Sequence, residues 1–409
     1  MPGEVRIPLH AIGKPAAPRP AGAGSDTAIA LQALPPLGLY VHLPWCVRKC
    51  PYCDFNSHEQ REALPEEAYS AALLADLEHA LPWIWGRRVV TVFFGGGTPS
   101  LFSPRAIDAL LAGFRARLNL AADAEITLEA NPGTVEAGRF REFRAAGINR
   151  LSLGIQSLSD GHLKALGRIH DAEEARRAIA IAQACFDNVN LDLMYGLPQQ
   201  TPEEARADLA EVIGFGTTHL SAYQLTLEPN TVFHRKPPTL PAHDVAAAMQ
   251  EAAEAQLAQA GFEHYETSAF ARPGQRCAHN LNYWQFGDYL GIGAGAHGKL
   301  SFPDRIERHA RAKQPREYMA LAREGRSIVE QRTVTRAELP FEYMLNALRL
   351  VEGVPRALFT ERTGLPEQVL EAALSRAEAR GLVRRDWQRL QPTLLGQRFL
   401  NDLLELFLA

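Results

Sequence analysis

Three cysteines stand close together near the start of the chain, in the stretch WCVRKCPYCDFNS at residues 45–57. Cys46, Cys50 and Cys53 follow a C-x3-C-x2-C spacing, and this stretch supplies no fourth cysteine. A structural zinc site needs four ligands, and His42 and His58 could complete one, although neither has a typical zinc-finger spacing. A 4Fe–4S cluster held by three thiolates instead leaves one iron free for an exchangeable ligand. The spacing therefore favours an open cluster over zinc or unliganded thiols.

The overall composition indicates in which cellular compartment these cysteines act. The 409 residues include 43 Lys and Arg against 47 Asp and Glu, so no global charge attracts the chain to nucleic acid or to an anionic membrane. We find no run of eighteen apolar residues and no apolar signal-peptide core, so we expect a cytoplasmic protein. In such a reducing compartment, clustered cysteines are metal or redox ligands more often than disulfides.

The chain divides into three parts by its sequence pattern. Residues 1–37 are rich in Pro, Ala and Gly without hydrophobic periodicity, which predicts a disordered leader. Residues 38–334 alternate short β-type runs with amphipathic stretches, a pattern that calls for a parallel sheet. The strands are expected at 38–43, 89–94, 125–130, 149–155, 188–195 and 219–227, and the helices at 65–81, 104–118, 135–146, 172–184 and 202–214.

Polar residues alternate with apolar ones along three of the expected strands. Glu125, Thr127, Glu129 and Asn131 share one face of their strand, and the next two strands repeat the pattern with Arg150, Ser152, Gly154 and Gln156, and with Asn188, Asn190 and Asp192. A parallel sheet covered by helices on both faces would show continuous apolar runs instead. The fold class is therefore predicted as α/β, a partial (β/α)6 barrel whose polar interior binds a ligand near the carboxyl ends of the strands.

Residues 335–409 change to a mostly helical pattern. A hairpin is expected at 382–393, followed by a closing helix at 394–408, which together predict a winged-helix-like domain. Such domains often bind DNA, but Arg384 and Arg385 alone are thin evidence, and no nucleic-acid partner is expected. A lid or a docking surface for an acceptor protein is the expected role.

The cysteine motif, with Tyr52 before its last cysteine, resembles the radical SAM superfamily. In that superfamily the open iron binds the amino and carboxylate groups of S-adenosylmethionine (SAM), and the fold is a partial barrel. The stretch FFGGGTPS at 93–100 is similar to the glycine-rich segment that receives the methionine end of SAM. Glycines at a strand end allow close approach of the backbone, although GGG alone is a weak motif.

Within the superfamily, the chain resembles the oxygen-independent coproporphyrinogen III oxidase group, and most of all its HemW branch of heme chaperones. The resemblance spans about residues 38–350 and includes GGGTPSL, EANPGT, NRLSLGIQS, LGRIH, NLDLMYGLP and HNLNYWQFGDYLGIGAGAHG, in that order. It implies that SAM contacts Tyr40, Gly96, Gly97, Thr98, Glu129, Gln156, Arg168 and Asp192.

Three features separate the branches of this group. The decarboxylating oxidases carry a further cysteine two residues after the third, where this chain has Phe55, and they have a longer structured N-terminal segment. The stretch HNLNYW matches a pattern associated with heme in the chaperone branch, which implies heme contacts by His279, Tyr283 and Trp284. Imidazole and phenol oxygen are both known axial ligands of heme iron, and Trp can stack on the macrocycle. The same run, read as a loop before a strand, could instead simply pack the edge of the barrel.

The resemblance implies three cofactors or ligands: a 4Fe–4S cluster, SAM and heme. The expected function is a heme chaperone that delivers heme to hemoproteins such as respiratory enzymes, docking transiently at the inner face of the membrane, with a homodimer as a further expectation. The alternative is an oxygen-independent coproporphyrinogen III oxidase, which decarboxylates propionate side chains by 5′-deoxyadenosyl radical chemistry. A third alternative is a regulatory or DNA-binding module built on the C-terminal domain.

Overall fold

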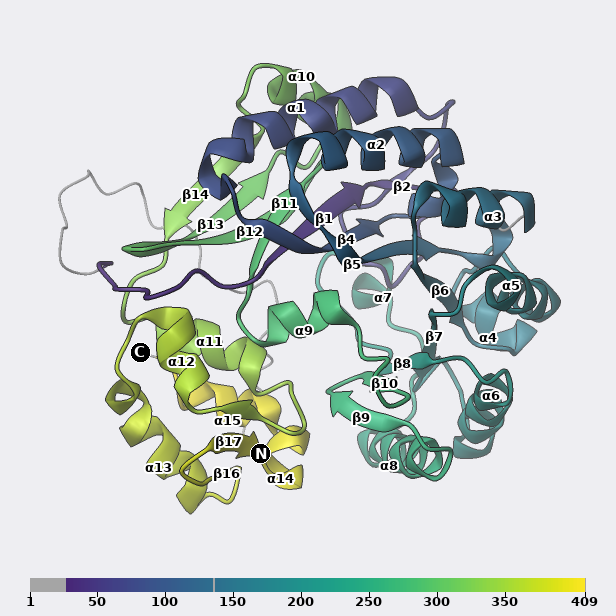
Figure 1. Cartoon of the computed structure of the whole chain (residues 1–409). Coiled ribbons are helices and arrows are strands. Elements are labelled where there is room, and N and C mark those ends of the chain that lie inside the picture. Colours follow the sequence, from purple (N-terminus) through teal and green to yellow (C-terminus); the bar gives the residue numbers. More distant parts are fainter. Residues whose placement is uncertain (1–26, 135–136, 409) are drawn as a thin grey trace.

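The computed structural model describes residues 27–134 and 137–408, and its centre is a 12-stranded open sheet (Figure 1). The middle of the sheet consists of parallel strands, in the spatial order β11 (Asp288–Ile292), β1 (Leu37–Leu43), β4 (Arg88–Gly96), β5 (Asn119–Ala130), β6 (Arg150–Gln156), β7 (Val189–Tyr195) and β8 (His219–Gln224). All six strands expected from the sequence are among them. The α/β fold with a parallel sheet is confirmed.

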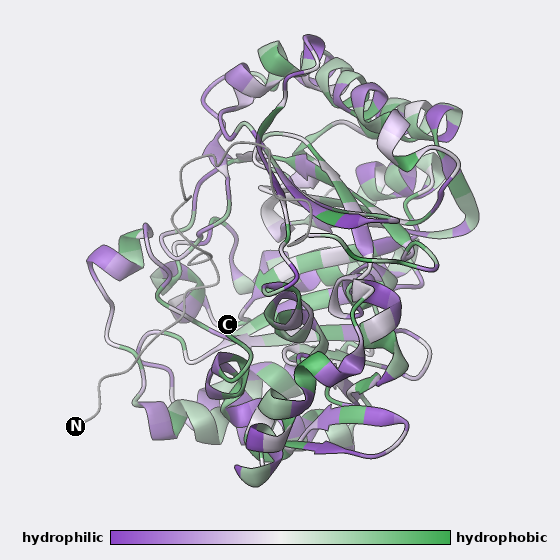
Figure 2. Ribbon diagram, turned by 90° about the vertical axis from the view of Figure 1, so that its left-hand side faces the viewer, coloured by the Kyte–Doolittle hydropathy of each residue, from purple (hydrophilic) through white to green (hydrophobic). Residues whose placement is uncertain are grey.

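A layer of helices covers one face of this sheet (Figure 1). Its main members are α1 (Glu66–Ile84), α2 (Pro104–Arg117), α3 (Ala137–Ala146), α5 (Ala172–Cys185) and α6 (Pro202–Gly214). Capping boxes start two of them, Asp171 with Glu174 at α5 and Thr201 with Glu204 at α6. In Figure 2 the helices at the top of the molecule carry both hydrophobic and hydrophilic residues, as expected when only one side of a helix is buried.

The main core lies between the sheet and this helical layer. Apolar strand residues such as Phe94, Leu128 and Leu153 pack in one cluster with Leu111 of α2 and Phe143 of α3, and all five are fully buried. The polar residues that alternate with these strand residues therefore point to the opposite face of the sheet. That face is where the chain can place a ligand.

Antiparallel strands extend the sheet at both edges, and short elements connect its parts. The edge strands are β9 (Glu263–Glu266), β10 (Ala269–Ala271), β12 (His297–Phe302), β13 (Arg305–Arg311) and β14 (Ile328–Thr333). The other elements are β2 (Trp45–Cys46), β3 (His58–Glu59), η1 (Pro99–Leu101), η2 (Pro132–Thr134), α4 (Asp160–Ala165), α7 (Val232–Arg235), α8 (His243–Gln259), α9 (Ala278–Trp284) and α10 (Pro315–Arg323). In the described residues the two edge strands, β14 and β9, do not pair with each other, so the barrel is partial.

The C-terminal part forms a second, mostly helical core. Its elements are α11 (Leu339–Ala347), β15 (Val354–Pro355), α12 (Ala357–Thr363), η3 (Glu367–Leu370), α13 (Glu371–Ala379), β16 (Val383–Arg385), β17 (Arg389–Pro392), α14 (Leu394–Arg398) and α15 (Leu400–Glu405). The predicted hairpin is present as β16 and β17. The prediction of a single closing helix at 394–408 is wrong, because Phe399 leaves the helical conformation at φ −114° and ψ 46° and separates α14 from α15. Within residues 27–134 and 137–408, no helix combines the length and apolar character needed to cross a membrane.

The folded part also begins earlier than the predicted residue 38. Residues 1–26 lie outside the described residues, but residues 27–37 of the expected leader are packed against the fold. Backbone hydrogen bonds of 3.1 Å and 2.9 Å join Ile29 to Asp304 and Leu31 to Pro303. The side chain of Ile29 is only 8% exposed and enters the C-terminal core. This burial of an apolar side chain orders a segment whose composition alone suggests disorder.

Candidate functional site

The cluster-type cysteines lie on a loop that the rest of the fold holds in place. Cys46 ends β2, and Cys50 and Cys53 follow in the loop; all three are free thiols of intermediate exposure. Asn56 donates hydrogen bonds of 2.9 Å from its Nδ2 to the carbonyls of Ala294 and Lys313, which lie 238 and 257 residues further along the chain. The loop is therefore ordered by the protein itself.

Burial and polar neighbours act on the thiols in opposite directions. Burial raises the pKa of the Cys46 thiol to about 11 and also raises the pKa of Cys53. Two polar groups lie within hydrogen-bond distance of the sulfur atoms. Ser57 Oγ lies 3.7 Å from the Cys53 Sγ, and Arg168 Nη1 lies 3.7 Å from the Cys50 Sγ. Such donors stabilise sulfur ligands of iron. Among the described residues, no three His, Cys, Asp or Glu side chains converge as they would around a single metal ion.

The glycine-rich segment ends β4 directly against this loop. A Cβ on Gly97 would lie 2.5 Å from the carbonyl oxygen of Trp45, and one on Gly96, at φ +118°, would lie 2.6 Å from the His42 ring. Only glycine fits at these positions. The backbone of Thr98 donates to the Trp45 carbonyl at 2.7 Å, so the segment and the loop form one surface.

Three of the predicted SAM contacts are more exposed than their neighbours on the same strand. Tyr40, Glu129 and Asp192 are partly exposed, while their immediate strand neighbours on both sides are buried. All three lie on the face of the sheet that the helical layer leaves free, on β1, β5 and β7. They therefore line a space that solvent or a ligand can reach.

Arg168 connects the cluster loop with the strand ends. Its Nη2 donates to Asn131 Oδ1 at 2.6 Å and to the Gly154 carbonyl at 2.7 Å, and its Nη1 faces Cys50. Asn131 in turn donates to Thr98 Oγ1 at 2.8 Å. Gln156, in the left-handed region at φ +67°, accepts a 2.7 Å hydrogen bond from Tyr223. The structure thus brings Cys50, Thr98 and Arg168 together, and Gln156 lies at the end of β6 beside them.

The two acids on this face, Glu129 and Asp192, both have raised pKa values. Burial, and then the neighbouring Asp192, raise the pKa of Glu129 to about 8, and burial also raises the pKa of Asp192. Gly96 N donates to Glu129 Oε2 at 3.2 Å. A cationic ligand would stabilise both carboxylates, and SAM is such a ligand because of its sulfonium and amino groups.

The HNLNYW stretch forms the helix α9, where the sequence suggests a loop. The carboxylate of Glu125 on β5 caps its start, accepting from the backbone of Ala278 at 3.0 Å and of His279 at 2.9 Å. The side chain of α9's own N-cap residue, Cys277, does not do this. Because the capping carboxylate lies far away in the sequence, local patterns could not reveal the helix.

His279 is buried and fully engaged. It is 1% exposed, and its ring hydrogen-bonds through Nδ1 with Thr91 Oγ1 at 2.8 Å and through Nε2 with Tyr283 OH at 3.0 Å, and stacks on Phe93. Burial, followed by the nearby charge of Arg150, lowers the pKa of His279 to about 3, which keeps the imidazole neutral. Trp284 faces away, beneath the guanidinium of Arg349 and against the C-terminal core. The structure therefore brings His279 and Tyr283 together but not Trp284.

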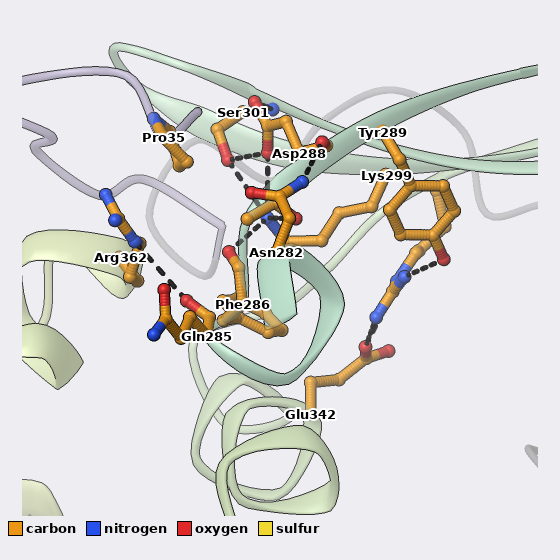
Figure 3. A network of polar contacts seen from close by, with 12 residues as sticks. Pro35, Asn282, Gln285, Phe286, Asp288, Tyr289, Lys299, Ser301, Glu342 and Arg362 are labelled. Carbon is orange, nitrogen blue, oxygen red and sulfur yellow. Dashed lines mark hydrogen bonds and ion pairs between the residues drawn. The ribbon is translucent and has the colours of Figure 1, made fainter. Parts of the chain in front are cut away.

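A second network of buried charges lies just beyond α9 (Figure 3). Asp288 pairs with Lys299 at 2.8 Å, and Lys299 also donates to the carbonyl of Phe286 at 3.1 Å. From the C-terminal part, Arg362 donates to the Gln285 carbonyl at 3.3 Å. The end of α9 is thus held by β11, β12 and α12 at once.

Several residues of the site carry little signal in the sequence. Asn131 and Arg150 belong to the alternating polar face, but nothing in their positions indicates a particular role, and the sequence makes His42 a candidate only for zinc. His42 instead hydrogen-bonds with Tyr40 OH at 3.0 Å and with the Asn56 carbonyl at 2.9 Å. Asn56 itself belongs to no detectable pattern.

Comparison with known proteins identifies the family and the fold of the chain. The family model for the radical SAM superfamily matches residues 40–212, and the model for the HemN C-terminal domain matches residues 334–399. The solved structure of coproporphyrinogen III oxidase (HemN) from Escherichia coli, a radical SAM enzyme, superposes with a TM-score of 0.77 at 25% identity and covers 91% of this chain and 90% of that one. The fold is that of a radical SAM protein.

Relatives in sequence narrow the family further. The heme chaperone HemW of Escherichia coli K12 is 52% identical over 92% of this chain and 99% of its own length, and HemW of Haemophilus influenzae is 47% identical over the same shares. The mitochondrial radical S-adenosyl methionine domain-containing protein 1 of Bos taurus is 38% identical over 95% of this chain and 81% of its own. The chain belongs to the HemW family of the radical SAM superfamily, which confirms the resemblance found in the sequence.

Proposed function

We propose that the protein is a heme chaperone that binds heme and, with a 4Fe–4S cluster and SAM, delivers it to acceptor hemoproteins such as respiratory enzymes. The observation that carries this choice is the 52% identity with a heme chaperone along nearly the whole chain, against 25% with the oxidase. Phe55 supports it, because this side chain is 60% exposed on the cluster loop where the oxidases have a cysteine. We place the protein in the cytoplasm, with transient docking at the inner face of the membrane, and as a homodimer.

The cluster and SAM have matching residues in this chain. Cys46, Cys50 and Cys53 would hold the cluster, which when bound supplies an iron for the amino and carboxylate groups of SAM. The glycines at 96 and 97 permit close approach, and the partly exposed Tyr40, Glu129 and Asp192 line the space beyond them. Thr98, Gln156 and Arg168 complete the proposed SAM contacts.

His279 is the proposed heme contact, and the hydroxyl of Tyr283 is hydrogen-bonded to one of its ring nitrogens. A neutral imidazole is the form that coordinates iron, and burial keeps His279 neutral. Its Nε2 is bonded to Tyr283 OH at 3.0 Å, so coordination through that atom requires this hydrogen bond to break. Trp284 has a different role in this proposal, since it fixes α9 to the C-terminal part beneath Arg349.

The C-terminal part would receive the acceptor. Arg349 and Arg362 hold α9 from this side, so a protein docking there acts on the helix that carries His279. This contact supports a docking role without requiring a nucleic-acid partner.

Reconstitution of the full chain with iron and sulfide tests the function. Heme is titrated into wild type, His279→Ala and the control His79→Ala, whose histidine is exposed on α1, and coproporphyrinogen III turnover is assayed with SAM and a reductant. We expect stoichiometric heme binding that only His279→Ala weakens, with no protoporphyrinogen formed. Protoporphyrinogen without heme binding would overturn the proposal in favour of the oxidase, which the TM-score of 0.77 makes the second candidate.

A further inference from the structure

Arg150, the first residue of β6, is a buried cation without a direct partner. The residue is 2% exposed, and its Nε has no hydrogen-bond partner in the described part of the chain. Other arginines in that part of the chain also have a buried nitrogen without a partner, but Arg168 makes three hydrogen bonds and Arg311 contacts Asp76. For Arg150, no hydrogen bond or ion pair joins its guanidinium to any residue within 27–134 and 137–408.

The polar groups around Arg150 are already occupied. Glu125, whose charge acts on Arg150, accepts from the backbone of Ala278 and His279 and lies 3.4 Å from the Cys277 thiol. Asp192 accepts from Asn190 at 2.8 Å and from Ser152 at 3.3 Å. The hydrogen bonds of both carboxylates thus go to groups other than the guanidinium, and no hydrogen bond joins either of them to Arg150 among the described residues.

A second unpaired group stands beside it. Thr127 pairs with Arg150 across β5 and β6, is fully buried, and its Oγ1 also has no partner among the described residues. On its other side Thr127 pairs with Phe93, whose ring stacks on His279 with 5.0 Å between centroids. Arg150, Thr127 and the Phe93–His279 pair thus form one row across the polar face.

Burying a charge and a hydroxyl without hydrogen bonds is costly, so such groups in one place indicate a missing ligand group. The planar guanidinium matches a carboxylate with two parallel hydrogen bonds, and a hydroxyl adds a third. The row runs over two strand spacings, about 10 Å, from Arg150 to His279. A porphyrin reaches across a comparable length from its iron to a propionate.

We propose that Arg150 and Thr127 form a carboxylate subsite that receives a propionate of heme while His279 faces the iron. This inference rests on the proposed heme-chaperone function. It adds an anchor that orients the macrocycle on the polar face, with the propionate over β5 and β6 and the iron over β4.

A pair of ligands tests the subsite. Heme and heme dimethyl ester, which lacks both free carboxylates, are titrated into the reconstituted full chain as wild type, Arg150→Met, Arg150→Lys and Thr127→Val. Wild type should prefer heme over the ester by roughly 10- to 100-fold, the range for hydrogen bonds to a charged group. Arg150→Met should lose that preference through weaker heme binding, with ester binding unchanged. Arg150→Lys should keep part of it, and Thr127→Val most of it.

Two results would overturn the subsite: equal weakening of heme and ester by Arg150→Met, which a structural role of the arginine predicts, or a wild type that does not discriminate between them. Cluster absorption of each variant reports that the fold is retained, and Arg150→Lys keeps the charge if the methionine variant does not fold. Failure of the proposed function has a different signature, because heme binding would then be insensitive to His279→Ala.

Discussion

Two groups of charges lie near α9, and they are built differently. In the first, Asp288 accepts from Lys299 and Ser301 through Oδ1 and from Arg87 and the Ser301 backbone through Oδ2, at distances of 2.7 to 2.8 Å (Figure 3). In the second, Glu129 accepts a single 3.2 Å bond from Gly96, and Arg150 has no hydrogen bond within the described residues.

The pKa values follow this difference. Burial alone would raise the pKa of Asp288, but Lys299 and Arg87 hold it below its usual value. On the sheet face, burial and the neighbouring Asp192 raise the pKa of Glu129 to about 8. A charge that the protein pairs for itself contributes to folding, whereas a charge left unpaired is available to a ligand. We therefore assign the first group to stability and the second to binding.

The sharpest test of the assignment removes the central acid of the paired group. Asp288→Asn leaves Lys299, which is 1% exposed, without its carboxylate, and should lower the free energy of unfolding by about 3–5 kcal/mol. Urea denaturation followed by circular dichroism measures the loss. The control Asp304→Asn removes the exposed partner of Arg305 and should cost under about 1 kcal/mol. Similar losses in both variants would contradict the contrast.

Glu129→Gln tests the second group through the pH dependence of the free energy of unfolding. Because the folded-state pKa of Glu129 is about 8, the folded chain holds a proton that the unfolded chain has released, so this residue's contribution to stability is complete below about pH 4.5 and is lost as pH rises toward 8. For this partly exposed group we expect wild type to lose about 1 kcal/mol between pH 6 and pH 8 relative to Glu129→Gln. Urea midpoints of the cluster-free chains measure the difference, and SAM binding should weaken in the variant. A pH dependence identical to that of wild type would mean that Glu129 is ionised in the folded state.

Tyr283→Phe should have the smallest effect of the three substitutions. It tests the helix α9, which lies near both groups. It removes the hydroxyl bonded to His279 Nε2, so coordination of heme iron no longer requires that hydrogen bond to break. Heme affinity should rise by a few-fold, as expected for one neutral hydrogen bond. Absorption titration with wild type and Tyr283→Phe measures the change. A loss of affinity would instead show that the Tyr283 oxygen contacts heme itself.

Much of the binding face could be predicted from the sequence, because alternation along a strand is local information. The alternating positions of Glu125, Thr127 and Glu129 predict that these residues share one face of their strand, and the structure has them there. The resemblance added the cysteine and SAM positions, whose ligand contacts stay a prediction.

The remaining features depend on contacts distant in sequence. The helix α9 owes its capped start to Glu125, over 150 residues earlier, so its own stretch suggests a loop. Ile29 is ordered by a contact with the turn at Asp304. Arg150 is visible in the sequence as a polar residue on a strand, but only the structure shows that the neighbouring Glu125 and Asp192 hydrogen-bond to other groups.

The position of β1 in the sheet has a consequence for synthesis of the chain. β1 pairs with β4 on one side and with β11 on the other, where Leu37 meets Asp288 and Val41 meets Ile292. On the ribosome, that second edge of β1 has no partner strand until residue 292 has emerged. Such late, non-local strand pairing is slow and exposes the chain to aggregation. Since α9 directly precedes β11 in the chain, the helix that packs on β1 and β4 arrives together with the strand that pairs with β1. The nascent protein therefore acquires His279 and the second partner of β1 in one late step.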